Sequence, residues 1–592
     1  MIFGLALPHQ YNTRVNLLAR RIAPFRLIFA LTLTLPAHAQ TNWLPLDQIQ
    51  AGQKGIGRTV FSGATISEFN VEILGVLENI GPKQSVILAR LSGGPLAHTG
   101  VMQGMSGSPV WINGKLIGAV ALAFPFSKDP IAGIRPIAEM FETGPSRPGP
   151  ARPLAELKLG DFSSLKEIAT PVSFGGFPQA TLDRFAPEWR KLGLEPRQGV
   201  SAGRPGASTP SARPIEPGSM ISVHLMSGDL SVAAEGTVTA IDGRKLFAFG
   251  HRFLALGDAE MPFARAEVIA LLPSLNTSFK ISSAKEWLGT ITADRNAAIS
   301  GELGRKPNLI PVQLAVGPKR YQFEMVSNRS LSPLLLQMAA MAALDGTERG
   351  FGASTIGVRG QIRFTDRTLP PLRFDNIFTS DYNAAAGAGL AIASPLATLL
   401  EAAVPGAQVA AIELTLDTRE EKRQMRIDQA WPSRRETRPG DEVELTMTFA
   451  TENGAELQRR LKYRVPAGAE NGPLYFSISD GSGLNAQEIR SLYAGGSLAG
   501  KTPAQVVDLL NQMRTNRRAY VRVWQSEPAY TAGSSDLSNV PKSVALTLSR
   551  ATQGSATAVM SGAGSRLAEF PIDLGDDFVI TGSKLVQVEV KN

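Results

Sequence analysis

The stretch that decides the fold is VMQGMSGSPVWINGKLIGAV, residues 101–120. Asn113-Gly114 separates two apolar runs, which is typical of a β-hairpin because both central residues of a type I′ turn need positive φ. Ahead of the hairpin, Ser106 lies between Gly104 and Gly107. Glycine adopts backbone angles that other residues avoid. The pattern therefore predicts a tight turn that carries a serine and leads into a rigid hairpin.

Ser106 is a candidate nucleophile on this pattern. A serine hydroxyl attacks a carbonyl only when a base takes its proton and backbone N–H groups stabilise the oxyanion. In a G-x-S-G-x-P turn, the N–H groups of Gly104 and Ser106 are expected to point into one hollow. The alternative interpretation is a structural glycine turn in a glycine-rich chain.

The base is sought among five histidines, of which His9 and His38 precede the mature chain defined below. His224 alternates within the strand-like ISVHL and is interpreted as structural. His98 lies in a predicted loop, PLAHTG, eight residues before Ser106. His251 ends the apolar run KLFAFGH after a glycine, which places it at the end of a predicted strand. We favour His251 over His98 as the base.

A carboxylate is expected to fix the tautomer of His251. Asp258, in LALGDAEMP, and Asp294, in GTITADRNAAISG, are both suitable, and each can also be an ordinary turn residue. The chain has no cysteine and no H-E-x-x-H motif, and no phosphate-binding fingerprint stands at a strand-to-helix junction. We therefore predict neither a metal nor a cofactor.

Residues 1–39 have the pattern of a secretory signal. A basic region precedes the short apolar run LIFALTLTL, and Ala37-His38-Ala39 offers a cleavage site. The pattern predicts export to the periplasm or the extracellular space, with a retained N-terminal anchor as the alternative. The net charge of +8, partly supplied by the signal, is too dispersed to indicate nucleic-acid binding. No later segment has 18 uninterrupted apolar residues, so no membrane span is expected after cleavage.

The organisation of the chain is predicted to be mainly β with some α. Pro-rich and Gly-rich stretches separate runs of alternating strands, and residues 180–194 are predicted to form a helix that is broken or kinked near Pro187. The expected parts are a serine-bearing barrel half (40–142), a connector with a helix (143–218), a histidine-bearing barrel half with helices (219–407), an immunoglobulin-like β-sandwich (408–480) and a mixed α/β region (481–592).

The serine segment resembles the nucleophile segment of the SpoIVB-type serine peptidases, which share the chymotrypsin-like double-barrel design. The resemblance rests on GMSGSP around Ser106, on EGTVTAIDGRKLFAFGH ending at His251, and on FSKDPIAGIRPIAEM after the hairpin. It implies that Ser106 is the nucleophile and His251 the base. In that family the histidine half comes first, whereas here Ser106 precedes His251, as in a circular permutation. The PDZ module usual in the family is not evident.

The resemblance implies a serine endopeptidase that cleaves protein or peptide substrates through an acyl-enzyme, with narrow specificity, in signalling or on itself. The alternative is a non-enzymatic envelope protein that keeps the double barrel as a scaffold. Labelling of Ser106 by a fluorophosphonate distinguishes the two.

Overall fold

The computed structural model describes most of the chain after residue 41. The ranges are 42–82, 84–142, 165–199, 213–346, 352–401, 407–494, 501–525, 529–532, 535–537, 543–544, 557–560, 565–575 and 577–591. Residues 42–592 form one compact unit. The predicted signal peptide, 1–39, lies outside the described residues, as do 143–164 and 200–212 of the connector.

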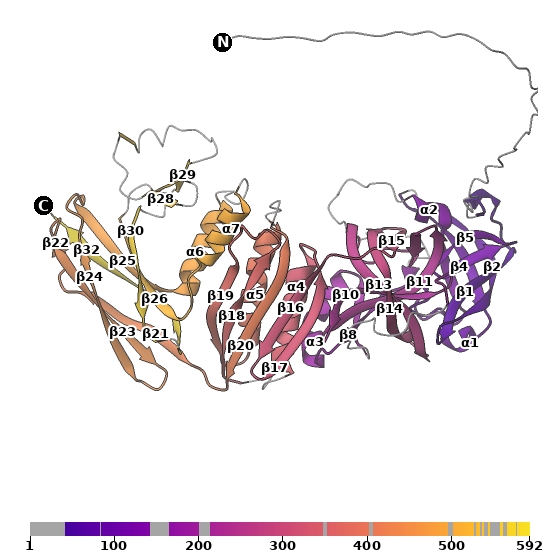
Figure 1. Ribbon diagram of the computed structural model, residues 1–592, viewed down its shortest axis with the longest axis horizontal. Helices are drawn as coiled ribbons and strands as arrows, with labels where there is room; N and C mark the ends of the chain where they lie inside the picture. Colours follow the sequence, from indigo (N-terminus) through magenta and orange to yellow (C-terminus); the bar gives the residue numbers. More distant parts are fainter. Residues whose placement is uncertain are drawn as a thin grey trace, which may run out of the picture. The chain divides into compact units, whose positions relative to one another are not determined.

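The first sheet closes into a six-stranded antiparallel barrel (Figure 1). Its strands follow one another around the barrel in the order β4 (Pro109–Ile112), β1 (Lys54–Ser62), β2 (Thr65–Gly81), β3 (Gln84–Ser92), β6 (Ile131–Pro136) and β5 (Lys115–Ala123). The pairing of β4 with both β1 and β5 closes the ring. The short elements η1 (Leu46–Gln48), α1 (Leu96–Thr99), α2 (Ile137–Phe141) and the edge strand β7 (Lys166–Glu167) accompany this barrel.

The hairpin predicted at Asn113-Gly114 joins β4 to β5. Asn113 has φ +49° and Gly114 has φ +76°, as a type I′ turn requires. Ile112 pairs with Lys115 across this two-residue turn. The hairpin therefore forms the rigid support that the sequence predicts behind Ser106.

The second sheet contains another closed six-stranded antiparallel barrel. Its order is β10 (Met220–Gly228), β13 (Gly257–Leu272), β14 (Phe279–Arg295), β15 (Ala298–Leu303), β12 (Lys245–Ala248) and β11 (Ser231–Asp242). The pairing of β10 with β11 closes this ring. β8 (Thr170–Gly175) and β9 (Leu194–Gln198) extend the sheet beyond β11, and α3 (Gln179–Lys191) joins them without a break at Pro187. The two closures confirm the predicted chymotrypsin-like barrel fold.

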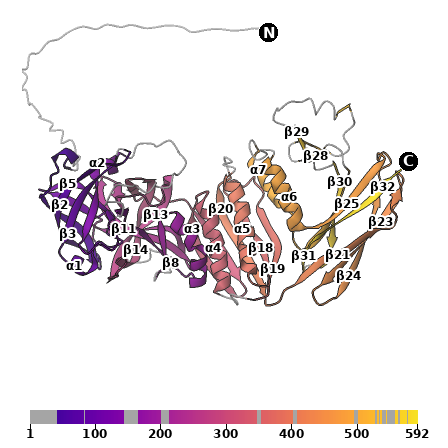
Figure 2. The same ribbon diagram turned by 180° about the vertical axis from the view of Figure 1, so that it is seen from behind.

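The second sheet continues past the barrel through β10. The added strands are β17 (Lys319–Val326), β16 (Leu309–Val316), β20 (Val409–Arg419), β18 (Ser354–Phe364) and β19 (Leu372–Ser380). Helices α4 (Leu331–Asp345) and α5 (Ala384–Glu401) pack on each other beside these strands (Figures 1 and 2). By length and composition alone α5 could cross a membrane, but it contacts α4, β18 and β19 here. β20 falls within the expected 408–480 sandwich, yet it pairs with β16 and β18 because its alternating apolar face completes their core.

A β-sandwich follows β20 and reaches the C-terminal strands. One sheet contains β24 (Glu456–Arg464), β23 (Glu442–Thr451), β21 (Gln424–Pro432) and β31 (Val579–Thr581). The other contains β22 (Glu436–Thr437), β32 (Ser583–Val590), β25 (Gly472–Asp480), β26 (Arg518–Gln525) and β30 (Ser565–Asp573). Helices α6 (Gly481–Ala494) and α7 (Pro503–Asn511) and the small sheet β27 (Ala529–Ala532), β28 (Ser535–Leu537) and β29 (Thr557–Met560) complete this part. The sandwich core therefore draws on residues from 425 to 590, beyond the expected limit at 480.

The two barrels are joined by backbone and side-chain contacts. Gly63 forms a β-bridge with Val268, and Gln103 forms one with Phe279. A shared apolar cluster combines Leu116 and Ala119 of the first barrel with Phe247 of the second. The barrels consequently meet beside the segment that contains Ser106.

Candidate active site

The loop of residues 104–107, which we call the nucleophile loop, is fixed from both ends by the first barrel. Met102 and Met105 are fully buried in that barrel's core. Gly104 has φ +90° and Gly107 has φ +88°, so both turns of the loop use backbone angles that favour glycine. The loop places Ser106 between the two barrels.

The second barrel holds the other side of the nucleophile loop through β11. The Thr237 N–H donates to the Ser106 carbonyl at 2.8 Å, and the Thr237 hydroxyl donates to the Gly104 carbonyl at 2.9 Å. The Thr239 hydroxyl donates to the Gly107 carbonyl at 2.7 Å. Both threonines are fully buried. Three hydrogen bonds from two residues of β11, one from a backbone N–H and two from side-chain hydroxyls, thus fix the loop that carries Ser106.

Close approach of the barrels leaves no room for a side chain at Gly107. A Cβ there would lie 2.1 Å from the Thr237 carbonyl oxygen and 2.5 Å from the Phe249 nitrogen, both backbone atoms. A Cβ at Gly104 would lie 3.1 Å from the side chain of Lys280, which can yield slightly. Glycine is therefore required at 107 both by φ and by contact.

Two backbone N–H groups of the nucleophile loop are available for an oxyanion. Among the hydrogen bonds of the described residues, the loop's donors are Met105 N to Met102 O and Gly107 N to Val120 O, and neither Gly104 N nor Ser106 N donates. Fixed, unused N–H groups that flank a nucleophile are the arrangement an oxyanion hole requires. The two groups are those that the sequence predicts.

His251 follows β12 on a strained turn. Phe249 and Gly250 both have φ +71°. The His251 Nδ1 atom lies 2.6 Å from the Arg252 carbonyl oxygen. A carbonyl oxygen only accepts, so the hydrogen bond assigns the proton to Nδ1 and leaves the lone pair on Nε2, the tautomer of a general base. Nε2 is buried and has no hydrogen-bond partner in the described part of the chain.

Burial lowers the pKa of His251 below its ordinary value of 6.5. The charge of Glu167 opposes this effect, whereas the charges of Arg135 and Arg252 add to it. Neutral imidazole is therefore the stable form of His251 near neutral pH, as a base requires.

The neighbours of Ser106 and His251, Gly107 and Gly250, both lie against the carbonyl of Val120 in β5. Gly107, next to Ser106, donates its N–H to that carbonyl at 2.8 Å. A Cβ on Gly250, next to His251, would lie 3.3 Å from the same oxygen. Ser106 is 3% exposed and His251 is 2% exposed. The structure brings the two segments together but draws no hydrogen bond between Ser106 and Nε2 of His251.

The two predicted aspartates have different surroundings. The Asp294 carboxylate is buried and accepts from Phe253 N at 2.8 Å and from Leu254 N at 2.7 Å. Burial raises the pKa of Asp294, and these N–H bonds partly offset the rise. Asp258 is 94% exposed in its side chain and pairs with Arg295. Asp294 thus anchors the loop after His251, whereas Asp258 lies at the surface.

Sequence reasoning did not identify Glu167 of β7, whose charge acts on His251. Its carboxylate oxygens lie 3.6 Å from Arg252 Nε and 4.0 Å from Arg135 Nη2. Arg135 is 2% exposed, and it also contacts Glu139. No motif marks Glu167, because it reaches the site from the connector through the pairing of β7 with β5.

The other two histidines of the described residues, His98 and His224, have different surroundings. His98 lies in α1 with its side chain exposed. His224 is buried in β10, its ring meets Trp287 edge-on, and burial lowers the pKa of His224 to about 4. The described residues contain no group of three or more His, Asp or Glu side chains that could hold a metal.

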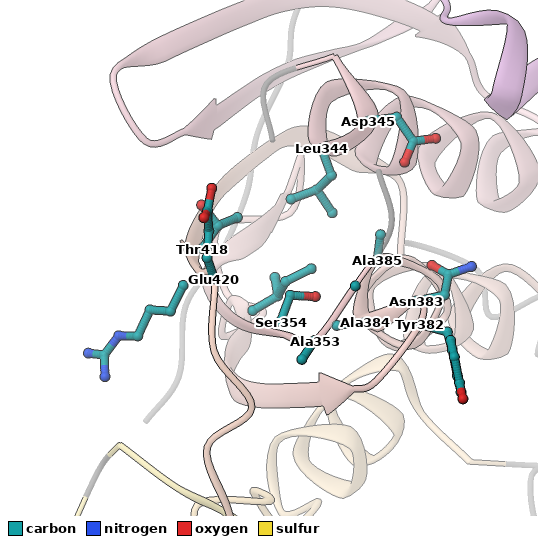
Figure 3. A pocket seen from close by; sticks show the side chains of 13 residues that line it. Leu344, Asp345, Ala353, Ser354, Tyr382, Asn383, Ala384, Ala385, Thr418 and Glu420 are labelled. Atoms are coloured by element: carbon teal, nitrogen blue, oxygen red, sulfur yellow. The ribbon is translucent and has the colours of Figure 1, made fainter. Parts of the chain in front are cut away.

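A small cavity lies elsewhere, at the ends of α4 and α5 (Figure 3). Leu344, Ser354 and Tyr382 are among its lining residues, and its volume is about 40 Å³. Asp345, at its edge, is already bonded to Thr181. The cavity is too small for a peptide, so the junction of the barrels remains the candidate site.

Comparison with known families gives a match within the first part of the chain. The sequence model of the family described as SpoIVB peptidase S55 matches residues 37–140. No curated protein and no solved structure matches the chain. The match covers the first barrel and ends before His251. Residues 37–140, which include Ser106 and the hairpin behind it, are therefore similar to the SpoIVB peptidase S55 family.

Proposed function

We propose that the protein is an exported serine endopeptidase in which Ser106 is the nucleophile and His251 is the base. The observation that carries the proposal is the convergence of the nucleophile loop and the turn before His251 on the Val120 carbonyl. The loop's unused N–H groups and the Nδ1–H tautomer of His251 support it. Export rests on the sequence pattern of residues 1–39 alone.

The mechanism follows from these roles. His251 Nε2 takes the proton of Ser106 as the hydroxyl oxygen attacks the peptide carbonyl, and the Gly104 and Ser106 N–H groups stabilise the oxyanion. His251 then gives the proton to the leaving amine. In the second half of the reaction His251 takes a proton from water, the water oxygen attacks the acyl carbonyl, and His251 returns the proton to the Ser106 oxygen as the acid leaves. Asp294 positions His251 indirectly, because it holds the backbone of Phe253 and Leu254.

Narrow specificity agrees with the low exposure of Ser106 and His251, since an enclosed site admits few proteins. The same enclosure favours the second candidate, a scaffold that keeps the barrels without activity. Cleavage of selected proteins, in signalling or on the chain itself, is part of the proposal.

Fluorophosphonate labelling of the purified chain tests the proposal. We expect labelling at Ser106 that disappears in Ser106→Ala and falls by a factor of about 10³ in His251→Ala, because loss of the base removes most activation of the hydroxyl. His98→Ala is the matched control, since its side chain is exposed, and it should label like the wild type. Absence of labelling in the folded chain, with no self-cleavage, would favour the scaffold.

A further inference from the structure

One edge of β5 pairs in turn with β4, with the nucleophile loop and with β7. β4 pairs with this edge as far as Ala119, and Val120 then exchanges hydrogen bonds with Gly107 and Ser108. β7 pairs with Leu122 and Ala123. Those two residues also pair with β6, so β7 must lie on the edge opposite β6, which is the edge shared with β4. β7 therefore occupies the edge of β5 immediately beyond the nucleophile loop.

β7 runs along β5 with its C-terminal end towards the nucleophile loop, as a peptide would if its C-terminal end reached Ser106. Lys166 lies opposite Ala123, Glu167 lies opposite Leu122, and Ile168 donates its N–H to the Ala121 carbonyl at 2.9 Å. The chain thus runs towards Val120 and the nucleophile loop. Extended peptides commonly bind by adding a strand to a sheet edge, where main-chain bonds give affinity and alternate side chains give specificity.

The side chains of this segment alternate between the two halves of the candidate site. Ile168 is 5% exposed and packs in the first barrel's core, to which Met105 and Val120 belong. Glu167 turns towards Arg252, the residue after His251. A cavity of about 180 Å³ adjoins residues 166–169 on the side of the 124–127 and 274–278 loops. The segment then enters β8 at Thr170 and so passes between the barrels.

We propose that residues 165–169 occupy the peptide-binding edge of β5 as an intramolecular pseudosubstrate. Peptides that compete for this edge run in the same direction, with an aliphatic residue in place of Ile168 and an acidic residue in place of Glu167. The proposal rests on the proposed function. Activation then requires displacement of the segment.

Substitutions within the segment test its role in the full chain. Ile168→Asp places a charge where the aliphatic side chain is buried, and Ile168→Ser removes the apolar anchor with less risk to folding. We expect both variants to raise the rate of fluorophosphonate labelling at Ser106 by about tenfold or more, because they increase the fraction of open sites. Lys166→Asp is the matched control, since the same charge enters the same strand at an exposed position. Equal rates in wild type, Ile168→Ser and Lys166→Asp would overturn the inference and leave the proposed function intact.

Peptide binding provides a readout that does not depend on catalysis. A fluorescein-labelled peptide LKEIAT, residues 165–170, is titrated into Ser106→Ala chains and followed by fluorescence anisotropy. We expect binding when Ile168→Ser is also present and at least tenfold weaker binding without it, because the tethered segment competes at high effective concentration. Equal binding to the two chains, or binding to neither, would overturn the inference. If no chain labels at Ser106, the proposed function fails and this titration alone decides whether the edge is occupied.

Discussion

Replacement of Gly107 by alanine tests whether the two barrels must touch at the nucleophile loop. Alanine at φ +88° costs about 1 kcal/mol in backbone strain. Its Cβ also meets two backbone atoms of the second barrel, at 2.1 and 2.5 Å, and backbone at that distance must move. Movement breaks the three hydrogen bonds from Thr237 and Thr239 to the loop. At about 1 kcal/mol each, these bonds add about 3 kcal/mol to the cost.

Gly114→Ala is the control that has the backbone strain of Gly107→Ala without its steric contact. Gly114 has φ +76°, and no atom lies within 4 Å of its added Cβ, so only the strain of about 1 kcal/mol applies. Urea unfolding followed by tryptophan fluorescence should therefore show about 3 kcal/mol more destabilisation for Gly107→Ala than for Gly114→Ala. Labelling of Ser106 should fall by about 10² in Gly107→Ala alone, the rate equivalent of the lost positioning energy. Equal stability and equal labelling of the two variants would refute the contact between loop and β11.

Three further outcomes follow from the charged groups. Because burial lowers the pKa of His251, the acid limb of the labelling rate should have its midpoint below pH 6.5, and a midpoint above that value would contradict the neutral buried base. Asp294→Asn leaves one acceptor oxygen for three backbone N–H donors, those of Phe253, Leu254 and Leu256, so labelling should fall by about tenfold or more. Asp258→Asn at the surface should label normally, and equal rates in the two variants would remove the positioning role of Asp294. Burial lowers the pKa of Lys280 to about 7, so the folded chain loses a proton that the unfolded chain keeps up to about pH 10.5, and the contribution of Lys280 to stability should rise as the pH increases from 7. Buried Glu235, whose pKa is raised to about 8, acts in the opposite direction. Urea unfolding at about pH 7 and pH 9 should therefore show a smaller gain or a larger loss of stability with pH in Lys280→Met than in the wild type, and an equal change in the two chains would contradict the buried Lys280.

The sequence predicted the features that depend on neighbouring residues. The turn at Asn113-Gly114 is set by the φ values those residues accept, and the glycine angles around Ser106 have the same local origin. The apolar run that ends at His251 likewise forms the expected strand, β12. The role of each residue in catalysis stays a prediction.

Features that depend on distant pairing were not predictable from local patterns. Thr237 and Thr239 are ordinary β-branched strand residues in sequence, and only the packing of β11 on the nucleophile loop gives them a function. Glu167 is placed near the site by the pairing of β7 with β5. β7 is only two residues long, and the composition of the connector around it does not predict so short a strand. β20 has the alternation of apolar and polar residues that is typical of a sandwich strand. It pairs with β16 and β18 instead, because its apolar side chains pack in their core.

The order of the two barrels along the chain has a consequence for the site. Each barrel closes on strands that are contiguous in sequence, so either order of the halves can fold. With the serine barrel first, the connection must leave the first barrel after β6 and α2 and reach β8, which pairs with β11, the strand that holds the Ser106 carbonyl through Thr237. Part of this connection, residues 165–169, lies beside the nucleophile loop. There β7 pairs with the edge of β5 that β4 leaves uncovered. The order of the halves and the proposed occupation of the β5 edge are therefore linked by the same connection, because the segment that joins the two barrels is also the segment that pairs with β5.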